Sequence, residues 1–244
     1  CLGFLPTSVS SISTVRNSIS SQGSTLAGAG VLFHFSRRFI LMALQISSVE
    51  HLKVVGWDID DTLFDLFTPS CRELSYMYDV DLSYPTILKR VMKPSFDPKG
   101  DFFSQLIPGT TPDDISAFYR DMGNVVYSDC QVFPFALALV KLQLEAGTKV
   151  VFITARPEEW YDLTRAELDK HGLQDAELYH DSSKVELAKK LGVELFFDDN
   201  YLNYLNFRRA NIPINLVYHP SNFRMVEKKN LPALNFNPLF TPRK

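Results

Sequence analysis

The feature that most constrains the fold is an apolar strand that ends in two closely spaced carboxylates. Residues 54–64 read VVGWDIDDTLF, so Asp58 and Asp60 come at the end of the apolar run. Side chains two residues apart in a strand point to the same side, and α/β sheets bind ligands at the carboxyl ends of their strands. The two carboxylates should repel each other, and a bound cation would relieve that repulsion. The run therefore predicts a metal-assisted reaction in which one carboxylate attacks and the other moves a proton.

A second apolar run, residues 149–153, ends in a hydroxyl group. It is followed by Thr154, Ala155, Arg156 and Pro157. Pro157 suits the first turn of a following helix, and the amide groups at a helix start favour an anion. The Thr154 hydroxyl could bind a phosphoryl oxygen there, although this segment alone would read as an ordinary strand-to-helix turn.

Two later segments carry a lysine and a second pair of carboxylates. Lys184 lies in the first turn of a predicted helix that ends at Gly192, where a cation opposes the helix dipole unless an anion lies nearby. The apolar run 193–197 is then followed by Asp198 and Asp199. Each of these pieces lies at the end of a predicted strand or at the start of a predicted helix.

The four segments resemble the four motifs of the haloacid dehalogenase (HAD) phosphohydrolase superfamily, over roughly residues 52 to 220. The resemblance implies that Asp58 is the nucleophile and forms an aspartyl-phosphate. It implies that Asp60 protonates the leaving oxygen and then deprotonates the water that hydrolyses the intermediate. The residues expected to bind the substrate phosphate are Thr154, Ala155, Arg156 and Lys184.

The resemblance also implies a Mg²⁺ cofactor. We expect the ion to be held by Asp58, by the backbone carbonyl of Asp60 and by Asp198. Asp199 is the second choice for the direct ligand, because it could instead act through water or orient Lys184. A leaving-group acid at Asp60 favours phosphatases over dehalogenases within the superfamily.

The substrate is less constrained than the chemistry. The chain looks most like 5'(3')-nucleotidase-type members, so a nucleoside monophosphate is expected. It departs from the deoxyribonucleotidase pattern at Asp61, where glycine is frequent. A sugar-phosphate or other small-molecule phosphatase is the alternative, an end-processing phosphatase on nucleic acid is a third, and a phosphomutase would use the same residues. A non-catalytic HAD-fold binding module is the alternative of another class.

The remaining pattern predicts an α/β fold, a Rossmann-like parallel sheet with helices on both faces. Strands are expected near 53–58, 148–153, 176–179, 193–197 and 214–218, and helices near 134–146, 158–171, 183–191 and 201–209. This alternation stops after Phe64 and resumes at about residue 132. There the segments near 66–78, 84–92 and 112–127 look helical, and 94–109 reads as a loop.

These patterns divide the chain into four parts. The HAD core domain is expected to comprise residues 50–65 and 132–222, and residues 66–131 form a helical cap where members of the C1 type carry one. Aromatic residues of this cap are expected mostly to form its core, and some could stack on a nucleobase. Residues 223–244 are expected to be an extended or frayed tail, and residues 1–49 a disordered leader.

Composition narrows the partners and the location. Net charge is −3, so nucleic acid is an unexpected partner; the expected one is a small phosphorylated substrate, with the oligomeric state left open. No apolar run is long enough to span a membrane, and three widely separated cysteines suit a reducing compartment. A cytoplasmic location is expected. Residues 1–41 could instead be an organellar transit segment, because they are rich in serine and lack acidic residues, or Met42 could be the true start.

Overall fold

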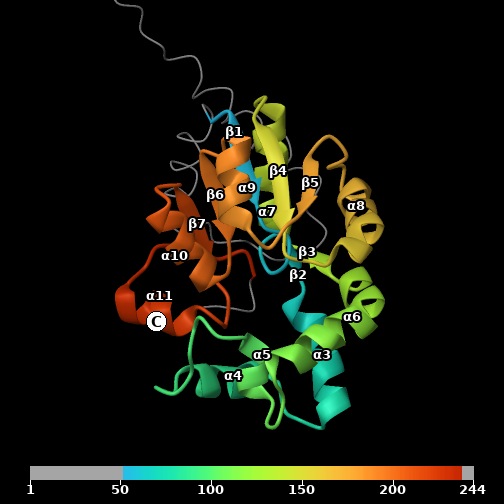
Figure 1. Ribbon diagram of the computed structural model, residues 1–244, viewed down its shortest axis with the longest axis vertical. Coiled ribbons are helices and arrows are strands. Elements are labelled where there is room, and N and C mark those ends of the chain that lie inside the picture. The colour runs from blue at the N-terminus through green and yellow to red at the C-terminus, as the bar shows by residue number, and fades with distance from the viewer. Residues whose placement is uncertain (1–51, 238–244) are drawn as a thin grey trace, which may run out of the picture. The chain divides into compact units, whose positions relative to one another are not determined.

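A six-stranded parallel sheet organises the part of the chain that the computed structural model describes, residues 52–237 (Figure 1). Its strand order is β5-β4-β1-β6-β7-β8, with β1 bonded to both β4 and β6. The strands are β1 (Val54–Trp57), β4 (Lys149–Thr154), β5 (Glu177–His180), β6 (Leu195–Asp198), β7 (Ile214–Val217) and β8 (Ala233–Leu234). The predicted Rossmann-like fold class is confirmed.

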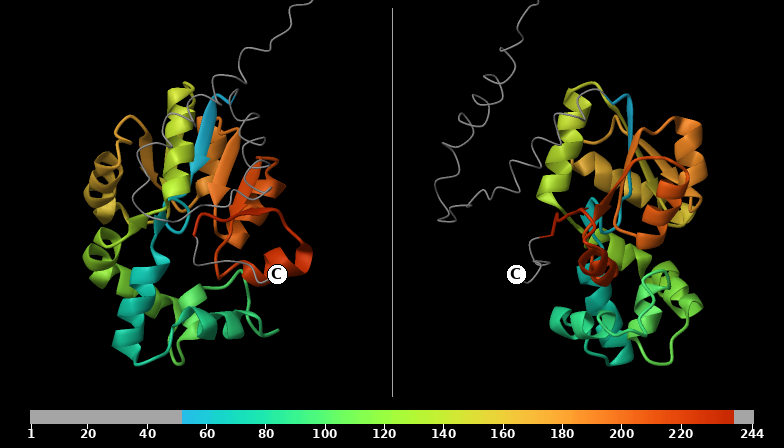
Figure 2. Two further views of the ribbon diagram at one scale, coloured as in Figure 1. Left: turned by 180° about the vertical axis from the view of Figure 1, so that it is seen from behind. Right: turned by 90° about the vertical axis from the view of Figure 1, so that its left-hand side faces the viewer.

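Helices cover both faces of this sheet. The views in Figures 1 and 2 place α7 on one face and α9 and α10 on the other. The helices of this part are α7 (Pro134–Glu145), α8 (Tyr161–Lys170) after a short 3-10 turn η1 (Glu158–Trp160), α9 (Lys184–Leu191), α10 (Tyr201–Arg209) and α11 (Phe223–Lys229). Gly192 ends α9 in the left-handed conformation, with φ +70°, as the sequence indicated.

Strand β1 is held in place by close aromatic packing. The ring of Trp57 stacks on Phe197 of β6 with 3.9 Å between centroids, and its indole N–H donates to Gln143 of α7. A Cβ at Gly56 would lie 2.3 Å from the ring of Phe196, so only glycine fits there. This packing fixes the strand whose end carries Asp58.

Between β1 and β4 lies a group of helices that we call the helical module, α3 to α6. It comprises α3 (Phe67–Tyr78), α4 (Tyr84–Val91), α5 (Phe102–Leu106) and α6 (Pro112–Ser128). A two-stranded antiparallel sheet of β2 (Phe64–Asp65) and β3 (Gln131–Val132) joins the chain entering the module to the chain leaving it. Thr111 starts α6 with a capping box to Asp114. The module lies beyond the carboxyl ends of the strands (Figure 1).

Two expectations about the secondary structure were wrong. The segment 94–109 is not entirely a loop, because it contains α5, which Asp101 caps by accepting from the backbone N–H of Ser104. The segment after residue 222 is neither extended throughout nor frayed, because α11 and β8 form there and β8 pairs with β7. The expectation for residues 1–49 lies outside the described residues. Within residues 52–237, no helix combines the length and the apolar character needed to cross a bilayer.

Candidate active site

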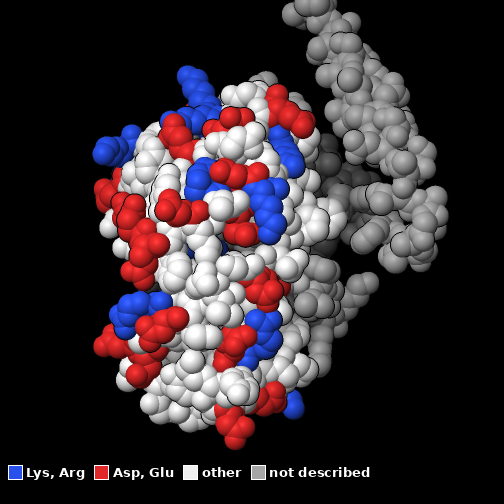
Figure 3. Space-filling model, turned by 90° about the vertical axis from the view of Figure 1, so that its right-hand side faces the viewer, with Lys and Arg blue, Asp and Glu red and all other residues white. Residues whose placement is uncertain are grey.

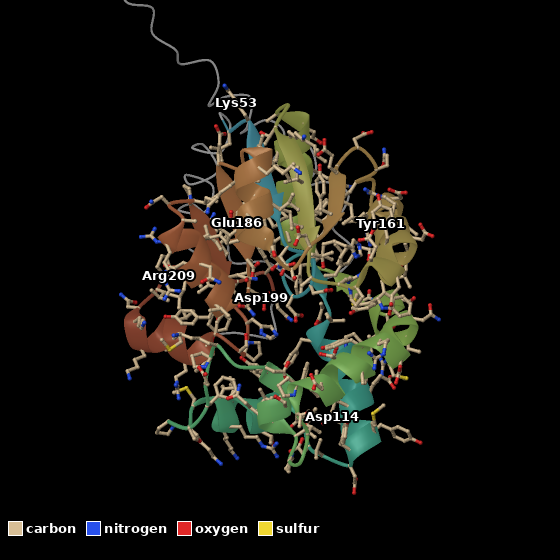
Figure 4. All side chains as sticks on the ribbon, in the orientation of Figure 1. Lys53, Asp114, Tyr161, Glu186, Asp199 and Arg209 are labelled. Carbon is tan, nitrogen blue, oxygen red and sulfur yellow. The ribbon has the colours of Figure 1, made fainter. Side chains whose placement is uncertain are left out.

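The predicted site residues meet at the carboxyl ends of three neighbouring strands. Asp58 follows β1, Thr154 ends β4 and Asp198 ends β6. Figure 4 shows Asp199 at the end of the sheet that faces the helical module, with Lys53 at the opposite end. Because β1 is bordered on both sides by strands that come later in the chain, this edge is the switch point where α/β sheets bind ligands.

Lys184 connects the two motif carboxylates. Its Nζ lies 2.7 Å from Oδ1 of Asp58 and 3.0 Å from Oδ2 of Asp198, and all three side chains are buried. Burial disfavours the charged lysine, but Asp198 and Asp58 outweigh it, so the pKa of Lys184 is raised above its ordinary value. The anionic neighbours predicted for this first-turn lysine are therefore present.

Asp58 is held rigidly at the centre of the site. Its backbone N–H donates to the carbonyl of Phe197 at 2.8 Å, and its Oδ1 accepts from the backbone N–H of Ile59 at 2.7 Å. Burial raises its pKa from 3.8 to about 7, Lys184 acts against that rise, and the nearby carboxylates of Asp198 and Asp60 add to it. A cation bound beside Asp58 would favour its ionised, nucleophilic form.

Asp198 and Asp199 differ in how fully their oxygens are engaged. Asp198 is fully buried; its Oδ1 accepts from the backbone N–H of Asn200, and its Oδ2 accepts from Asn203 and Lys184. The Asp199 side chain is 13% exposed, and burial raises its pKa well above the ordinary value. The arrangement favours Asp199 as the carboxylate with room for an additional ligand.

Asp199 belongs to two groups whose ligand atoms are close enough to surround one metal ion. One group is Asp58, Asp198 and Asp199, and the other is Asp61, Asp199 and His219; in each, the candidate ligand atoms lie within 4.8 Å of one another. Carboxylate oxygens are the ligands that Mg²⁺ prefers, so the first group fits the expected ion.

Arg156 occupies a different place from the other predicted phosphate-binding residues. Its guanidinium contacts the carboxylate of Asp60, with Nε 2.9 Å from Oδ2 and Nη2 2.5 Å from Oδ1. The Thr154 hydroxyl accepts from the backbone N–H of Arg156 at 3.2 Å and is buried, which orients its oxygen at the strand end. Ala155 is exposed on the same turn.

Two residues of the site were not assigned a role by the sequence. Asp61 has a left-handed backbone, with φ +57°, which explains why glycine suits this position, and Asp is among the residues that tolerate it. Its Oδ1 accepts from the backbone N–H of Phe67 at 2.8 Å. His219 follows β7, and its Nε2 lies 3.4 Å from Oδ2 of Asp61. Asp61 was visible inside the motif, whereas no pattern around His219 indicated the site.

Comparisons with known proteins agree with this picture. A "Putative nucleotidase" of Bacillus cereus is 27% identical over 150 residues, covering 59% of this chain and 75% of the relative. No family model matches the chain.

Solved structures show the same fold at low sequence identity. A haloacid dehalogenase-like family hydrolase from Streptococcus pneumoniae has a TM-score of 0.53 at 15% identity, covering 77% of this chain and 95% of that one. A structure titled "Putative haloacid dehalogenase-like hydrolase", from Bacteroides fragilis, also has a TM-score of 0.53 at 15% identity, covering 75% and 95%. These likenesses confirm the resemblance that the four motifs indicated, and the chain has the haloacid dehalogenase-like fold.

Proposed function

We propose that this protein is a Mg²⁺-dependent phosphomonoester hydrolase that works through an aspartyl-phosphate on Asp58. The observation that carries the proposal is the position of Lys184, whose ammonium lies within 3.0 Å of both Asp58 and Asp198 at the edge where β1 and β6 end. A buried cation at this point can hold a phosphoryl group against the attacking carboxylate. The similarity to HAD-like hydrolases in fold supports the same reaction class.

The chain's own residues account for both half-reactions. A carboxylate oxygen of Asp58 attacks phosphorus, the bond from phosphorus to the ester oxygen breaks, and Asp60 gives that oxygen a proton. Water then attacks the same phosphorus and loses a proton to Asp60, and the bond from phosphorus to Asp58 breaks. Phosphate leaves, and both carboxyl groups return to their starting forms. Thr154 and Lys184 orient the phosphoryl oxygens.

The metal site fits Mg²⁺ best with Asp199 as a direct ligand. Asp198 and Asp199 share one candidate metal group with Asp58, but both oxygens of Asp198 already accept hydrogen bonds, and one of them also contacts Lys184. We therefore propose that Asp58, the backbone carbonyl of Asp60 and Asp199 hold the ion, and that Asp198 positions Lys184. When bound, Mg²⁺ offsets the negative charge that builds up on the phosphoryl oxygens.

A nucleoside monophosphate is the substrate class we propose. The Bacillus cereus relative carries the name of a nucleotidase, and aromatic rings of the module reach the site: Phe67 and Phe102 lie 5.2 and 5.6 Å from the ring of His219. Phe102 is only partly buried, and stacking of a base on such a ring would be worth about 1–3 kcal/mol. The helical module would then act as the cap that selects substrate.

The net charge of −3 makes a large nucleic acid a poorer fit than a small phosphate ester. On the one face that Figure 3 shows, lysines and arginines are interspersed with aspartates and glutamates. A continuous basic surface of the kind that binds a nucleic acid backbone is not seen on that face.

The test is phosphate release from nucleoside monophosphates, sugar phosphates and 4-nitrophenyl phosphate, with Mg²⁺ or with chelator. The wild type should release phosphate only with the metal, and Asp58→Asn should release none. Asp121→Asn is the matched control, because it makes the same change of side chain at a position that is 73% exposed. Release that persists in Asp58→Asn would reject the nucleophile. Metal binding without any release would favour a non-catalytic binding module, and a preference for sugar phosphates would reject the nucleotide assignment.

A further inference from the structure

One edge of the Arg156 guanidinium donates hydrogen bonds to both carboxylate oxygens of Asp60. Nε and Nη2 face its two oxygens at 2.5 to 3.1 Å, an arrangement that matches the planar fork of arginine to a carboxylate. The Arg156 side chain is 2% exposed and that of Asp60 is 21% exposed. The arginine is thus the buried partner, and the proposed acid is the partly exposed one.

The other side of the guanidinium is fixed to the core. Nη1 donates to the hydroxyl of Thr164 in α8 at 3.2 Å, and that hydroxyl donates to the carbonyl of Trp160 at 2.8 Å. Thr164 is fully buried. With Asp60 on one edge and Thr164 on the other, the guanidinium plane has a defined orientation.

The face of the guanidinium is covered by the helical module. Its Cζ lies 4.2 Å from the ring centroid of Tyr127, a buried residue of α6, and the Tyr127 ring in turn meets Trp160 edge-on at 5.9 Å. Trp160 packs against Gly123 of α6, where a Cβ would come within 2.6 Å of the indole. Arg156 is therefore the point at which the Asp60 loop, α8 and the last helix of the module meet.

We propose that Arg156 is a positioning residue that fixes the carboxylate of Asp60 and links its orientation to helix α6 through the ring of Tyr127. The inference rests on the proposed function, in which Asp60 is the leaving-group acid. It differs from the phosphate-binding role that the sequence predicted for Arg156, because the guanidinium edges face Asp60 and Thr164 and its face meets Tyr127. In the first half-reaction, a residue acting through Asp60 should matter only where a proton must reach the leaving group.

The test measures the first turnover, the release of the phenol, for two esters of similar size. Phenyl phosphate has a basic leaving group that needs a proton, and 4-nitrophenyl phosphate has one that leaves without it. Arg156→Met should slow the phenyl ester by about 100-fold, toward the lower end of what a general acid contributes, and the nitrophenyl ester by less than about 5-fold. Tyr127→Leu should change the ratio of the two rates in the same direction by a smaller factor.

Two comparisons separate positioning from a structural or phosphate-binding role. In the Asp60→Asn background, Arg156→Met should have little further effect on the phenyl ester, because the two residues act as a unit. Arg165→Met is the matched control: this arginine lies in α8 and donates to the carbonyls of Leu173 and Ala176, and its loss should leave the ratio of rates unchanged.

The proposal is overturned if Arg156→Met slows both esters equally, or if its effect adds fully to that of Asp60→Asn. Either result would assign Arg156 to the phosphate or to the fold. A wild type that releases phosphate from no ester, the nucleoside monophosphates and sugar phosphates included, would instead reject the proposed function, and the inference with it, so the two failures are distinct.

Discussion

Replacing Asp58 by asparagine should stabilise the metal-free protein at neutral pH, although it removes the proposed nucleophile. The Asp58 carboxyl is buried, and burial, opposed by Lys184, raises its pKa from 3.8 to about 7. The folded protein then binds a proton that the unfolded chain releases, so the free energy of unfolding falls as the pH rises between these two values. The contribution of the protonated Asp58 carboxyl to stability is complete below its pKa in the unfolded chain, 3.8. It is lost as the pH rises through its pKa in the folded protein, about 7.

The magnitude follows from the size of the rise. One pKa unit corresponds to about 1.4 kcal/mol, so the whole rise is worth on the order of 4 kcal/mol. Asparagine has nearly the same shape and no charge to desolvate, and Lys184 keeps Asp198 as a partner at 3.0 Å. The advantage of Asp58→Asn over the wild type should therefore be small at about pH 4 and grow to a few kcal/mol at about pH 8.

The assay is urea unfolding of both proteins between about pH 5 and about pH 8, with chelator present. Asp121→Asn, whose side chain is 73% exposed, is the control and should change the free energy of unfolding by less than about 0.5 kcal/mol. Added Mg²⁺ should stabilise the wild type more than Asp58→Asn. The reasoning is refuted if Asp58→Asn is no more stable than the wild type at about pH 8, or if the difference between them does not change with pH.

Two further predictions concern the lysine and the glycine that shape the site. Lys184→Met should destabilise the metal-free protein by about 3–5 kcal/mol, because it leaves the buried carboxylates of Asp58 and Asp198 without their cation. Lys189→Met, on the same helix but 47% exposed, should cost less than about 1 kcal/mol; equal thermal shifts for the two variants would mean that the wrong lysine was chosen. Gly56→Ala should cost roughly 1–3 kcal/mol in urea unfolding, because its Cβ would lie 2.3 Å from the Phe196 ring, and an unchanged midpoint would disprove that contact.

The positions of the four motifs were predictable because each combines an apolar strand with a polar strand end. Such patterns fix which residues reach the sheet edge even before the strand order is known, and Asp58, Thr154 and Asp198 are found there. The lysine was predictable for an electrostatic reason: a cation in the first turn of a helix needs an anion nearby, and Lys184 has two.

The missed features depend on contacts between distant parts of the chain. Strand β8 contains only two residues, too few to show a pattern in the sequence. It is defined by its pairing with β7 and by the hydrogen bond from the Tyr218 N–H to the Leu234 carbonyl. The pairing of Arg156 with Asp60 joins residues 96 positions apart, and no local pattern distinguishes an arginine that binds phosphate from one that binds a carboxylate. Asp61 follows β1 and His219 follows β7, two strands far apart in sequence that have only β6 between them in the sheet.

The most direct test of the central claim is a burst experiment on Asp60→Asn with 4-nitrophenyl phosphate and Mg²⁺. Nitrophenolate leaves without an acid, but the intermediate then lacks the base that activates water. The account predicts a rapid burst of about one equivalent of nitrophenolate per enzyme, followed by slow turnover, with a phosphoryl group on the peptide that contains Asp58. A phosphoryl group on another residue, or the same burst when Asp58→Asn is added to the variant, would contradict it.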